Sequence, residues 1–247
     1  MNLVLDIGNS RVKCAIFEKN NCIEKAIWES ISLEILKEKI APFEIKNAIV
    51  YASGTEQEAI KNYLDAHFKV IRLTHETPIP IKNNYATPET LGKDRLAGVI
   101  AANFLFPKQA CLVVDAGSAL TFNFLDADAC FQGGSISVGL KMRYKALNHF
   151  TARLPLLSFD KEAVSDNLIG RDTVSAMTIG VQQGFVSEVE GLVRRYKKKY
   201  GKFQLLITGG DGAFLFENIK IKNKYYERDL VLIGLNRILN WNKMVDG

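Results

Sequence analysis

The chain has 247 residues, of which 47% are hydrophobic and 24% are charged, and its formal net charge is +5. This composition is typical of a globular protein with an ordinary hydrophobic core and enough residues for two domains. No stretch reaches the ~18 apolar residues that a membrane span needs, and the N-terminus lacks the basic region of a signal peptide. We therefore expect a cytoplasmic protein without a membrane partner.

Cysteine and histidine residues are few and scattered. No Cys-x-x-Cys pair occurs, and no histidine stands at metal-ligand spacing from a cysteine. This excludes the common zinc motifs, and a disulfide framework is not expected in a chain without an export signal. We expect buried or half-buried thiols. The residues are Cys14, Cys22, Cys111 and Cys130, with His67, His75 and His149.

Six basic residues between Arg194 and Lys202 account for the positive net charge. They stand at the end of a long helical pattern, where basic side chains interact favourably with the helix C-terminus. A nucleic-acid-binding patch is the alternative interpretation. We favour a solvated helix face and expect no nucleic-acid partner.

The first part of the chain alternates short β-rich runs with helical patterns. Thr55 and Glu58 have the spacing of a capping box, which predicts that a helix begins there. Prolines and asparagines between residues 77 and 88 predict an irregular loop. We expect strands at 3–5, 11–17, 22–28, 48–51 and 69–73, and helices at 32–40, after 55, and at 91–106.

The opening pattern begins again near residue 110. An apolar run ends in Asp115-Ala116-Gly117-Ser118, just as the first strand ends in Asp6-Ile7-Gly8-Asn9. A repeat at this spacing predicts a duplication, and the alternation of strands and helices predicts an α/β fold. We expect two similar domains, 1–109 and 110–247, that face a central cleft. The second would contain strands from 111, at 119–125, 131–137 and 203–207, and helices at 140–149, 172–196 and 228–241.

The first Asp-x-Gly motif lies at the predicted turn between two strands. Gly8 lets the backbone turn tightly and bring N–H groups close to an anion, while Asn9 and Ser10 add side-chain donors. Lys13 can bring a positive charge to the same phosphates, and Asp6 is an oxygen ligand suited to Mg²⁺. A single motif of this kind is also typical of an ordinary turn. Its second copy favours a pair of hairpins that clamp a polyphosphate.

A third glycine-rich loop, Thr208-Gly209-Gly210-Asp211-Gly212, follows a predicted strand and precedes a helix. Glycine at this place permits a nucleotide to approach a helix N-terminus closely. A plain strand-to-helix turn is the alternative. No Walker A sequence and no G-x-G-x-x-G motif occurs, so ATP would be bound by the paired hairpins.

Five motifs follow one another along the chain: Asp6-Ile7-Gly8-Asn9, Gly92-Lys93-Asp94-Arg95, residues 115–121, Gly133-Gly134-Ser135-Ile136 and Gly170-Arg171-Asp172-Thr173. They stand in the order seen in type III pantothenate kinases, and the chain resembles this family from residue 2 to about residue 212. The family belongs to the acetate and sugar kinase, Hsp70 and actin superfamily. The resemblance implies two similar actin-like (ribonuclease H-like) domains with mixed five-stranded sheets.

The resemblance further implies ATP-dependent phosphorylation of pantothenate to 4′-phosphopantothenate, the first step of coenzyme A biosynthesis. It implies ATP and Mg²⁺, with Asp6 reaching Mg²⁺ directly, through water or through phosphate. It also implies a monovalent cation, K⁺ or NH₄⁺, at Asp115. The expected ATP contacts are Asp6, Ile7, Gly8, Asn9, Ser10, Arg11, Val12, Lys13 and Ser118, together with Gly209 and Gly210 of the third loop.

For the acceptor, the resemblance implies that Asp94 is the base that accepts the proton of the pantothenate hydroxyl. Phosphoryl transfer needs charge neutralisation and alignment more than covalent catalysis, so a carboxylate near the hydroxyl and cations on the phosphates suffice. Family members are homodimers, so a homodimer is also implied. The residues implied to bind pantothenate are Tyr85, Gly92, Lys93, Asp94, Arg95 and Thr173.

Some positions depart from the family pattern. Ser10 and Ser118 stand where threonine is frequent, Val138 where proline is frequent, and Asp172 where asparagine is frequent. A charged Asp172 would repel the carboxylate of pantothenate. Two other functions stay open at this point: a non-catalytic accessory factor for transcription on the same fold, and a kinase for another small hydroxylated metabolite.

Overall fold

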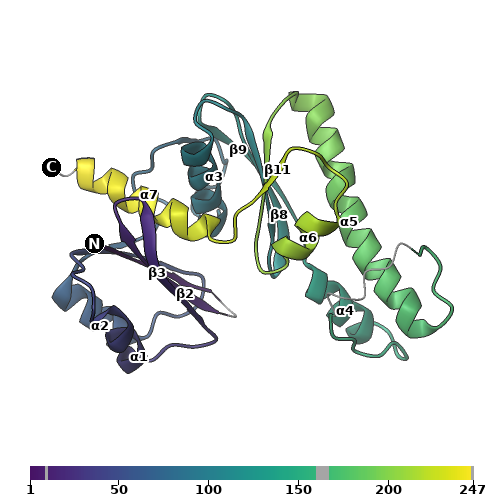
Figure 1. Ribbon diagram of the computed structural model, residues 1–247, viewed down its shortest axis with the longest axis horizontal. Helices are drawn as coiled ribbons and strands as arrows, with labels where there is room; N and C mark the ends of the chain where they lie inside the picture. Colours follow the sequence, from purple (N-terminus) through teal and green to yellow (C-terminus); the bar gives the residue numbers. More distant parts are fainter. Residues whose placement is uncertain (9–10, 160–166, 246–247) are drawn as a thin grey trace. The chain divides into compact units, whose positions relative to one another are not determined.

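Figure 1 presents the computed structural model of the chain, which describes residues 1–8, 11–159 and 167–245. The chain forms two compact units. The segment from Asp229 onward groups with the N-terminal half, whereas the sequence-based division assigned it to the second domain. The first unit contains Met1–Pro107, Ala129–Phe131 and Asp229–Gly247, and the second contains Lys108–Asp128 and Gln132–Arg228. The domain boundary after residue 109 stays a prediction.

A five-stranded mixed sheet forms the centre of the first unit, with the strand order β3-β2-β1-β4-β5. Strand β2 pairs antiparallel with β1 and β3, and β4 pairs in parallel with β1 and β5. The predicted sheet of this half is therefore confirmed. Its strands are β1 Asn2–Ile7, β2 Val12–Glu18, β3 Asn21–Trp28, β4 Asn47–Ala52 and β5 Lys69–Arg72; its helices are α1 Leu33–Ile40, α2 Glu58–His67, α3 Lys93–Leu105 and α7 Leu230–Val245.

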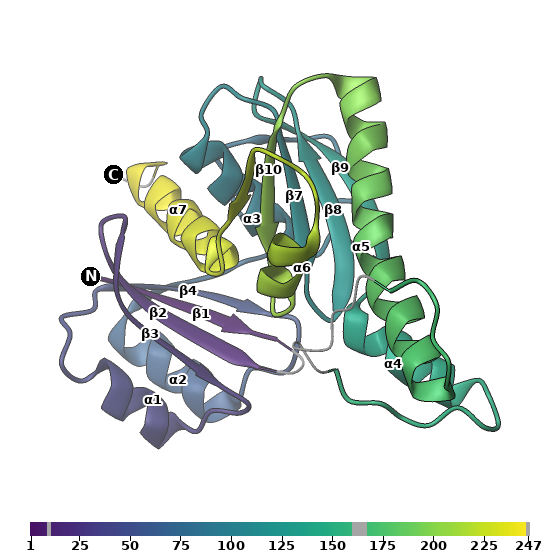
Figure 2. The same ribbon diagram turned by 45° about the vertical axis from the view of Figure 1, so that its right-hand side comes forward.

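Two pairs of helices cover the two faces of this sheet, α1 with α2 on one side and α3 with α7 on the other (Figure 2). Successive residues of a strand point to opposite faces. Leu5 and Ile7 of β1 therefore join the buried apolar cluster beneath α1 and α2. Asp6 points to the other face, where α7 packs on β1, β2 and β4. The alternation of β1 thus directs the first motif carboxylate to the side of α3 and α7.

Helices α3 and α7 cross too closely for a side chain at the crossing point. A Cβ on Gly234 of α7 would lie 1.9 Å from the backbone oxygen of Ala97 of α3. Next to the crossing, Asn2 Nδ2 donates a hydrogen bond to Asn236 Oδ1 at 2.8 Å, and Asn236 is only 1% exposed. A buried polar group is costly without its partner. This pair therefore fixes the position of α7, and with it α3, on the sheet.

The second mixed sheet has the strand order β11-β10-β7-β8-β9-β6. The family resemblance implied five strands, and the sheet has six, because the two-residue strand β6 pairs in parallel with Cys130 and Phe131 at the start of β9. Strand β7 pairs antiparallel with β8 and in parallel with β10. The bounds are β6 Lys82–Asn83, β7 Cys111–Ala116, β8 Ala119–Leu125, β9 Cys130–Val138, β10 Gln204–Thr208 and β11 Lys224–Tyr226.

Helix α5 is the longest helix of the second unit. Its buried Phe185 packs in one apolar core with Tyr144 of α4 and Phe122 of β8. Basic residues 197–199 occupy its last turn, as predicted for the basic run. The helices of this unit are α4 Leu140–His149, α5 Thr173–Tyr200 and α6 Gly212–Asn218.

Local details differ from the sequence-based predictions. The prediction of a capping box at Thr55 is wrong, because α2 begins at Glu58 and its N-cap is Gln57. The side chain of Gln57 instead donates a hydrogen bond to the carbonyl of Ile31 at 2.8 Å. The short strands β6 and β11 were not predicted.

No helix in the described part of the chain combines the length and the apolar character of a membrane span.

Candidate active site

The first Asp-x-Gly motif lies at the turn between β1 and β2. The Gly8 N–H donates a hydrogen bond to the Arg11 carbonyl at 2.9 Å, which closes the turn. A Cβ on Gly8 would lie 3.0 Å from that same oxygen, so a larger residue would crowd the turn. Arg11 is exposed. Asn9 and Ser10, which were predicted to contact ATP, lie outside the described residues.

Asp6 stands between two polar side chains on neighbouring strands. In the sheet it is paired with Lys13 of β2 and with Tyr51 of β4. Residues paired in register point to the same face, so the three side chains form a row on the side of α3 and α7. Lys13 Nζ lies 3.4 Å from Asp6 Oδ2. The row therefore brings a cation and a carboxylate together at the end of β1 where the motif turn begins.

The pKa of Asp6 is raised above its ordinary value, mainly because the side chain is buried. Only 7% of the residue is exposed. Lys13 opposes this rise through its charge and its hydrogen bond, and the negative charge of Asp94 adds to it. Burial disfavours the ionised carboxylate, and a neighbouring like charge does the same. Asp6 and Asp94 therefore influence each other within the first unit.

Asp94 lies in the first turn of α3. Its Oδ1 accepts a hydrogen bond from the Arg95 backbone N–H at 2.8 Å. A Cβ on Gly92, the N-cap residue of the helix, would lie 2.6 Å from that oxygen. Glycine at this position thus makes room for the carboxylate. The positive end of the helix dipole also favours a negative charge in the first turn.

Two residues predicted to bind the acceptor lie close to one another. The guanidinium carbon of Arg95 is 5.4 Å from the centre of the Tyr85 ring. The Tyr85 ring in turn stacks on Phe131 with ring centres 6.1 Å apart. Arg95 is only 7% exposed. The structure therefore groups Tyr85 and Arg95 beside the first turn of α3.

The ammonium group of Lys93 has a different environment. It donates hydrogen bonds to the carbonyl oxygens of Pro88 at 2.9 Å and of Leu91 at 2.8 Å. Burial lowers the pKa of Lys93. These contacts tie the preceding loop to the start of α3, which gives this lysine a structural role besides its predicted contact with the substrate.

The second Asp-x-Gly motif and the third glycine-rich loop meet in the second unit. The parallel pairing of β10 with β7 sets Thr208 beside Asp115. A Cβ on Gly209 would lie 2.4 Å from Asp115 Oδ1, and a Cβ on Gly117 would lie 3.2 Å from it. Gly209 also has φ +98, a conformation that favours glycine. The Asp115 carboxylate is therefore packed against glycine backbone from both motifs.

The two hairpins differ in the residue opposite the aspartate. Asp6 faces Lys13, whereas Asp115 faces the neutral Thr121. Ser118 is exposed at the second turn.

Across the described ranges, no three histidine, cysteine, aspartate or glutamate side chains are grouped as a metal site. A carboxylate packed on glycine backbone fits a monovalent cation that also takes backbone or water oxygens, since such ions need no dense cluster of charged ligands.

Thr173 is the first residue of α5 and belongs to the second unit. Asp172 precedes it as the N-cap, and its Oδ1 accepts a hydrogen bond from the Ser175 N–H at 2.9 Å. Hydrogen bonds from Ser175 lower the pKa of Asp172. Asp172 is therefore a charged capping residue. The predicted acceptor contacts are divided between the two units, with Thr173 alone in the second.

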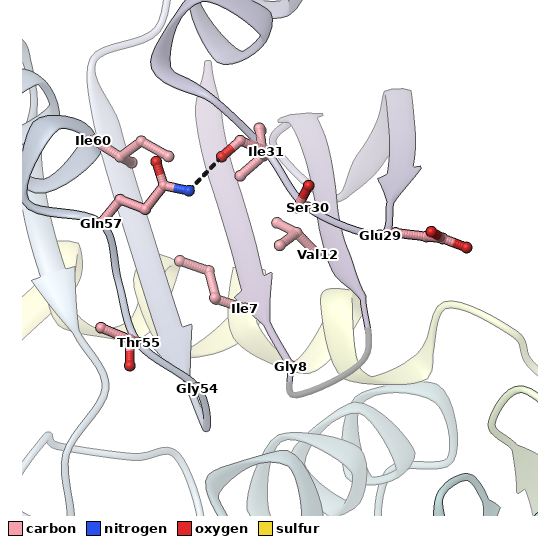
Figure 3. Close-up of a pocket in the computed structure, with 10 residues that line it drawn as sticks. All are labelled: Ile7, Gly8, Val12, Glu29, Ser30, Ile31, Gly54, Thr55, Gln57 and Ile60. Carbon is pink, nitrogen blue, oxygen red and sulfur yellow. Dashed lines mark hydrogen bonds between the residues drawn. The ribbon is translucent and has the colours of Figure 1, made fainter.

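A pocket of about 340 Å³ opens beside Gly8 in the first unit (Figure 3). Its apolar walls come from the α1/α2 side of the sheet, which is opposite to Asp6 and Lys13. Among the residues that the structure describes, no lysine or arginine and none of the predicted acceptor-binding residues lines it. The lining residues are Ile7, Gly8, Val12, Glu29, Ser30, Ile31, Gly54, Thr55, Gln57 and Ile60. The pocket therefore borders the motif turn without containing its charged groups.

Tyr51 was not predicted to belong to the site. Burial raises the pKa of Tyr51 to about 12, and the negative charges of Asp94 and Asp6 add to the rise. The residue is 8% exposed. The sequence contained one signal for it: a polar aromatic residue directly follows the apolar run Ala48-Ile49-Val50 at the end of a predicted strand. Its position beside Asp6 could not be identified from the sequence.

Comparisons with known proteins agree on one family. The model of the type III pantothenate kinase family matches residues 2–195. A type III pantothenate kinase of Phocaeicola vulgatus is 42% identical over 244 residues, covering 98% of this chain and 99% of the relative. Another, from Flavobacterium johnsoniae, is 39% identical and covers 89% of this chain and 90% of the relative.

Solved structures share the fold. A Campylobacter jejuni protein described as a Baf family transcriptional activator has a TM-score of 0.62 at 23% identity, covering 98% of this chain and 99% of that one. The activator of 2-hydroxyisocaproyl-CoA dehydratase from Clostridium difficile has a TM-score of 0.58 at 13% identity, covering 99% and 96%. Such likenesses show the fold alone. They confirm the expected α/β architecture of two actin-like units with mixed sheets.

Proposed function

Since this chain belongs to the type III pantothenate kinase family, we propose that it transfers the γ-phosphoryl group of ATP to the primary hydroxyl of pantothenate. The products are ADP and 4′-phosphopantothenate, which enters coenzyme A biosynthesis. The proposal is supported most by one grouping in the first unit: the Asp94 carboxylate at the start of α3 lies near Asp6, which is paired with Lys13. A base and a phosphate-binding cation are thus available on the same face of one sheet.

Asp94 is the proposed base. Its carboxylate accepts the proton of the pantothenate hydroxyl as the oxygen forms a bond to the γ-phosphorus and the bond to the ADP oxygen breaks. The hydrogen bond from the Arg95 N–H to Asp94 Oδ1 and the close approach of Gly92 orient this carboxylate. A base that is already oriented loses little entropy when the substrate binds.

The β1–β2 turn is the proposed site for the ATP phosphates. Lys13 supplies a positive charge, Gly8 allows close approach of the backbone, and Asp6 can hold Mg²⁺ directly or through water. When bound there, Mg²⁺ neutralises charge on the transferred phosphoryl group. Asn9, Ser10, Arg11, Ile7 and Val12 complete the proposed phosphate contacts.

The second unit supplies the remaining nucleotide contacts in this proposal. Ser118, Gly209 and Gly210 contact the nucleotide through side-chain and backbone donors. Asp115 holds K⁺ or NH₄⁺, which fits a carboxylate packed against the glycine backbone. Such a cation lowers the repulsion between the phosphates and the carboxylate.

The acceptor contacts are proposed from the grouping around α3. Arg95 stacks near Tyr85 and can bond the polar groups of pantothenate, while Gly92 and Lys93 shape the loop before Asp94. Thr173 is the least supported contact, because the charged Asp172 beside it would repel the pantothenate carboxylate.

A homodimer is proposed for the assembly. Several large apolar side chains of the second unit are exposed, among them Phe150 at 81%, Leu168 at 80% and Ile169 at 79%. Contiguous exposed apolar surface is typical of an interaction site, and we propose that these side chains contribute to the dimer contact. Light scattering after size exclusion should give about twice the chain mass of 27.6 kDa; a mass of one chain would contradict the dimer. We place the reaction in the cytoplasm, where its substrates are available.

The test of the function is an ADP-release assay with ATP and Mg²⁺, run with and without pantothenate in K⁺ and in Na⁺ buffer. We expect ADP release that depends on pantothenate and is faster in K⁺, with a product whose mass is that of phosphopantothenate. Other hydroxylated acceptors serve as controls. Release that is indifferent to pantothenate but follows another acceptor would replace the proposed substrate.

A further inference from the structure

We infer that Arg143 of α4 is a positioning residue for the turn of the second Asp-x-Gly motif, which Gly117 and Ser118 form. Its side chain and its backbone together hold the segment between β9 and α4 against that turn, and Glu188 of α5 anchors the side chain. This inference rests on the proposed contact of Ser118 with the nucleotide and adds a residue to that site. None of the predicted motifs includes Arg143 or Glu188.

The segment between β9 and α4 lies directly on the turn. Strand β9 is the neighbour of β8 in the sheet and ends at Val138. Gly139 follows as the N-cap residue of α4 and is buried. A Cβ on Gly139 would lie 2.2 Å from the carbonyl oxygen of Ser118 and 2.6 Å from that of Gly117. Backbone therefore meets backbone with no side chain between them, and the place of Gly139 fixes one side of the turn.

Arg143 bonds to both residues of this segment. Its Nε donates a hydrogen bond to the Val138 carbonyl at 3.0 Å, and its backbone N–H donates one to the Gly139 carbonyl at 3.1 Å. The backbone bond belongs to the first turn of α4, whereas the side-chain bond is additional to the helix. Arg143 therefore fixes the peptide groups on both sides of the Gly139 Cα.

Two side chains of α5 hold the Arg143 guanidinium. Helix α4 packs against α5 (Figure 2). Arg143 Nη2 donates a hydrogen bond to Glu188 Oε2, and the guanidinium carbon lies 5.3 Å from the centre of the Phe185 ring. Phe185 is fully buried in the core of the second unit. The side chains of Arg143 and Glu188 are only 20% and 26% exposed, so the guanidinium has a defined place between the two helices.

The pairing of charges favours positioning over a direct electrostatic effect on ATP. Glu188 neutralises Arg143, so the pair adds little net charge near the turn. The planar guanidinium donates in two directions at once, to the Val138 carbonyl with Nε and to Glu188 with Nη2. The pair therefore links α5 to the turn through Gly139. Removal of either partner loosens this link, whereas the two removals change the electrostatic potential at the phosphates in opposite directions.

The test compares Arg143→Met with Glu188→Gln, with the Kd for ATP measured by titration calorimetry. By electrostatics alone, the loss of a positive charge weakens ATP binding and the loss of a negative charge strengthens it. If Arg143 positions the turn, both variants weaken binding. We expect the Kd for ATP to rise about ten-fold in Arg143→Met and at least about three-fold in Glu188→Gln. A Kd that falls or stays unchanged in Glu188→Gln would overturn the positioning role.

Hydrogen exchange at the turn gives a second readout. The Gly117 N–H donates to the Ala119 carbonyl at 3.1 Å and closes the turn. Its exchange with solvent should be at least about ten-fold faster in Arg143→Met, because the turn loses its support. The KM for ATP should rise with the Kd, while the KM for pantothenate changes less than about two-fold. Unchanged exchange at Gly117 would contradict the inference.

Arg194→Met is the matched control. Arg194 also lies in the second unit, where it forms an ion pair along α5 with Glu190 at 3.8 Å, and its side chain is 71% exposed. This variant removes the same charge from the surface of the unit, so the Kd for ATP and the exchange rate of the Gly117 amide should stay those of the wild type. Equal effects of Arg194→Met and Arg143→Met would assign the effect to charge alone and overturn the inference.

The melting temperature of each variant reports whether the fold is kept. Glu188→Gln changes the side-chain volume little, and it decides the inference by the same readouts if Arg143→Met does not fold. ATP binding also separates this inference from the proposed function. If the wild type binds ATP but forms no phosphopantothenate, the proposed function fails and the Kd values still decide the role of Arg143. If pantothenate is phosphorylated and both variants bind ATP like the wild type, the function stands and the inference is wrong.

Discussion

The Cα of Gly92 faces the Asp94 carboxylate so closely that no methyl group fits between them: a Cβ on Gly92 would lie 2.6 Å from Asp94 Oδ1. Carbon and oxygen atoms cannot approach to that distance without a shift of one of them. The flexible side chain would yield before the helix does. Gly92 therefore sets the orientation of Asp94 and does more than begin a helix.

Gly92→Ala should accordingly damage turnover more than binding. We expect kcat to fall at least about ten-fold, because the carboxylate rotates away from its hydrogen bond with the Arg95 N–H, with the KM for ATP nearly unchanged. Steady-state kinetics with both substrates varied measures this. Gly191→Ala is the control, since nothing lies within 4 Å of its Cβ. Equal kinetics in the two variants would contradict the steric argument.

Asp6→Asn should stabilise the ligand-free protein at neutral pH. The pKa of Asp6 is raised from its ordinary value of 3.8, so the folded chain keeps this proton at pH values where the unfolded chain has lost it. The contribution of this group to the free energy of unfolding therefore falls as the pH rises from about that value through the raised pKa. Asparagine cannot ionise and lacks this loss.

Thermal unfolding from pH 4 to pH 7 tests this prediction. The melting temperature of Asp6→Asn should exceed that of the wild type by more at pH 7 than at pH 4. Asp128→Asn, at an exposed position in the β8–β9 turn, should show no such trend. If the difference in melting temperature between Asp6→Asn and the wild type is constant or falls with pH, the effect of Lys13 on the pKa of Asp6 outweighs the effect of burial.

Lys13→Met should weaken nucleotide binding. Lys13 Nζ lies 3.4 Å from Asp6 and its side chain is 33% exposed, so it can reach a phosphate and also neutralise the carboxylate. We expect the Kd for ATP to rise at least about ten-fold, as for the loss of a charged hydrogen bond. Titration calorimetry measures the Kd. Lys39→Met, which removes an ion pair with Glu24 in the same unit, should leave it unchanged.

Gly209→Ala should impair the cation site of the second unit. Gly209 has φ +98, and a Cβ would lie 2.4 Å from Asp115 Oδ1. We expect a loss of about 1–2 kcal/mol in stability from the backbone conformation alone, and a smaller ratio of activity in K⁺ to activity in Na⁺. Denaturant unfolding and the ADP-release assay measure the two effects. A K⁺ dependence equal to that of the wild type would remove Asp115 from the cation site.

Much of this site could be predicted from the sequence because its motifs combine strand ends with glycine. Asp6 and Asp115 both follow apolar runs, and each is followed after one residue by a glycine that turns the chain. The turns of the two hairpins follow from such local signals. The meeting of Gly209 with Asp115 was not predicted, because it depends on the parallel pairing of β10 with β7.

The rest depended on pairings that a linear pattern does not contain. Tyr51 lies beside Asp6 only because β4 pairs in parallel with β1 in this register. The predicted capping box at Thr55 does not form, because helix α2 begins later, at Glu58. The side chain of Gln57, just before the helix, bonds to the carbonyl of Ile31. Helix α7 groups with the first unit because Gly234 and Asn236 fit α3 and β1, contacts that no spacing in the sequence predicts.

We propose above that the Asp94 carboxylate is the base of phosphoryl transfer to pantothenate. The most direct test compares Asp94→Asn with the wild type in pantothenate-dependent ADP release, together with the Kd for ATP. We expect kcat to fall about 10²–10⁴-fold while the Kd for ATP stays that of the wild type. Wild-type turnover in this variant would contradict it.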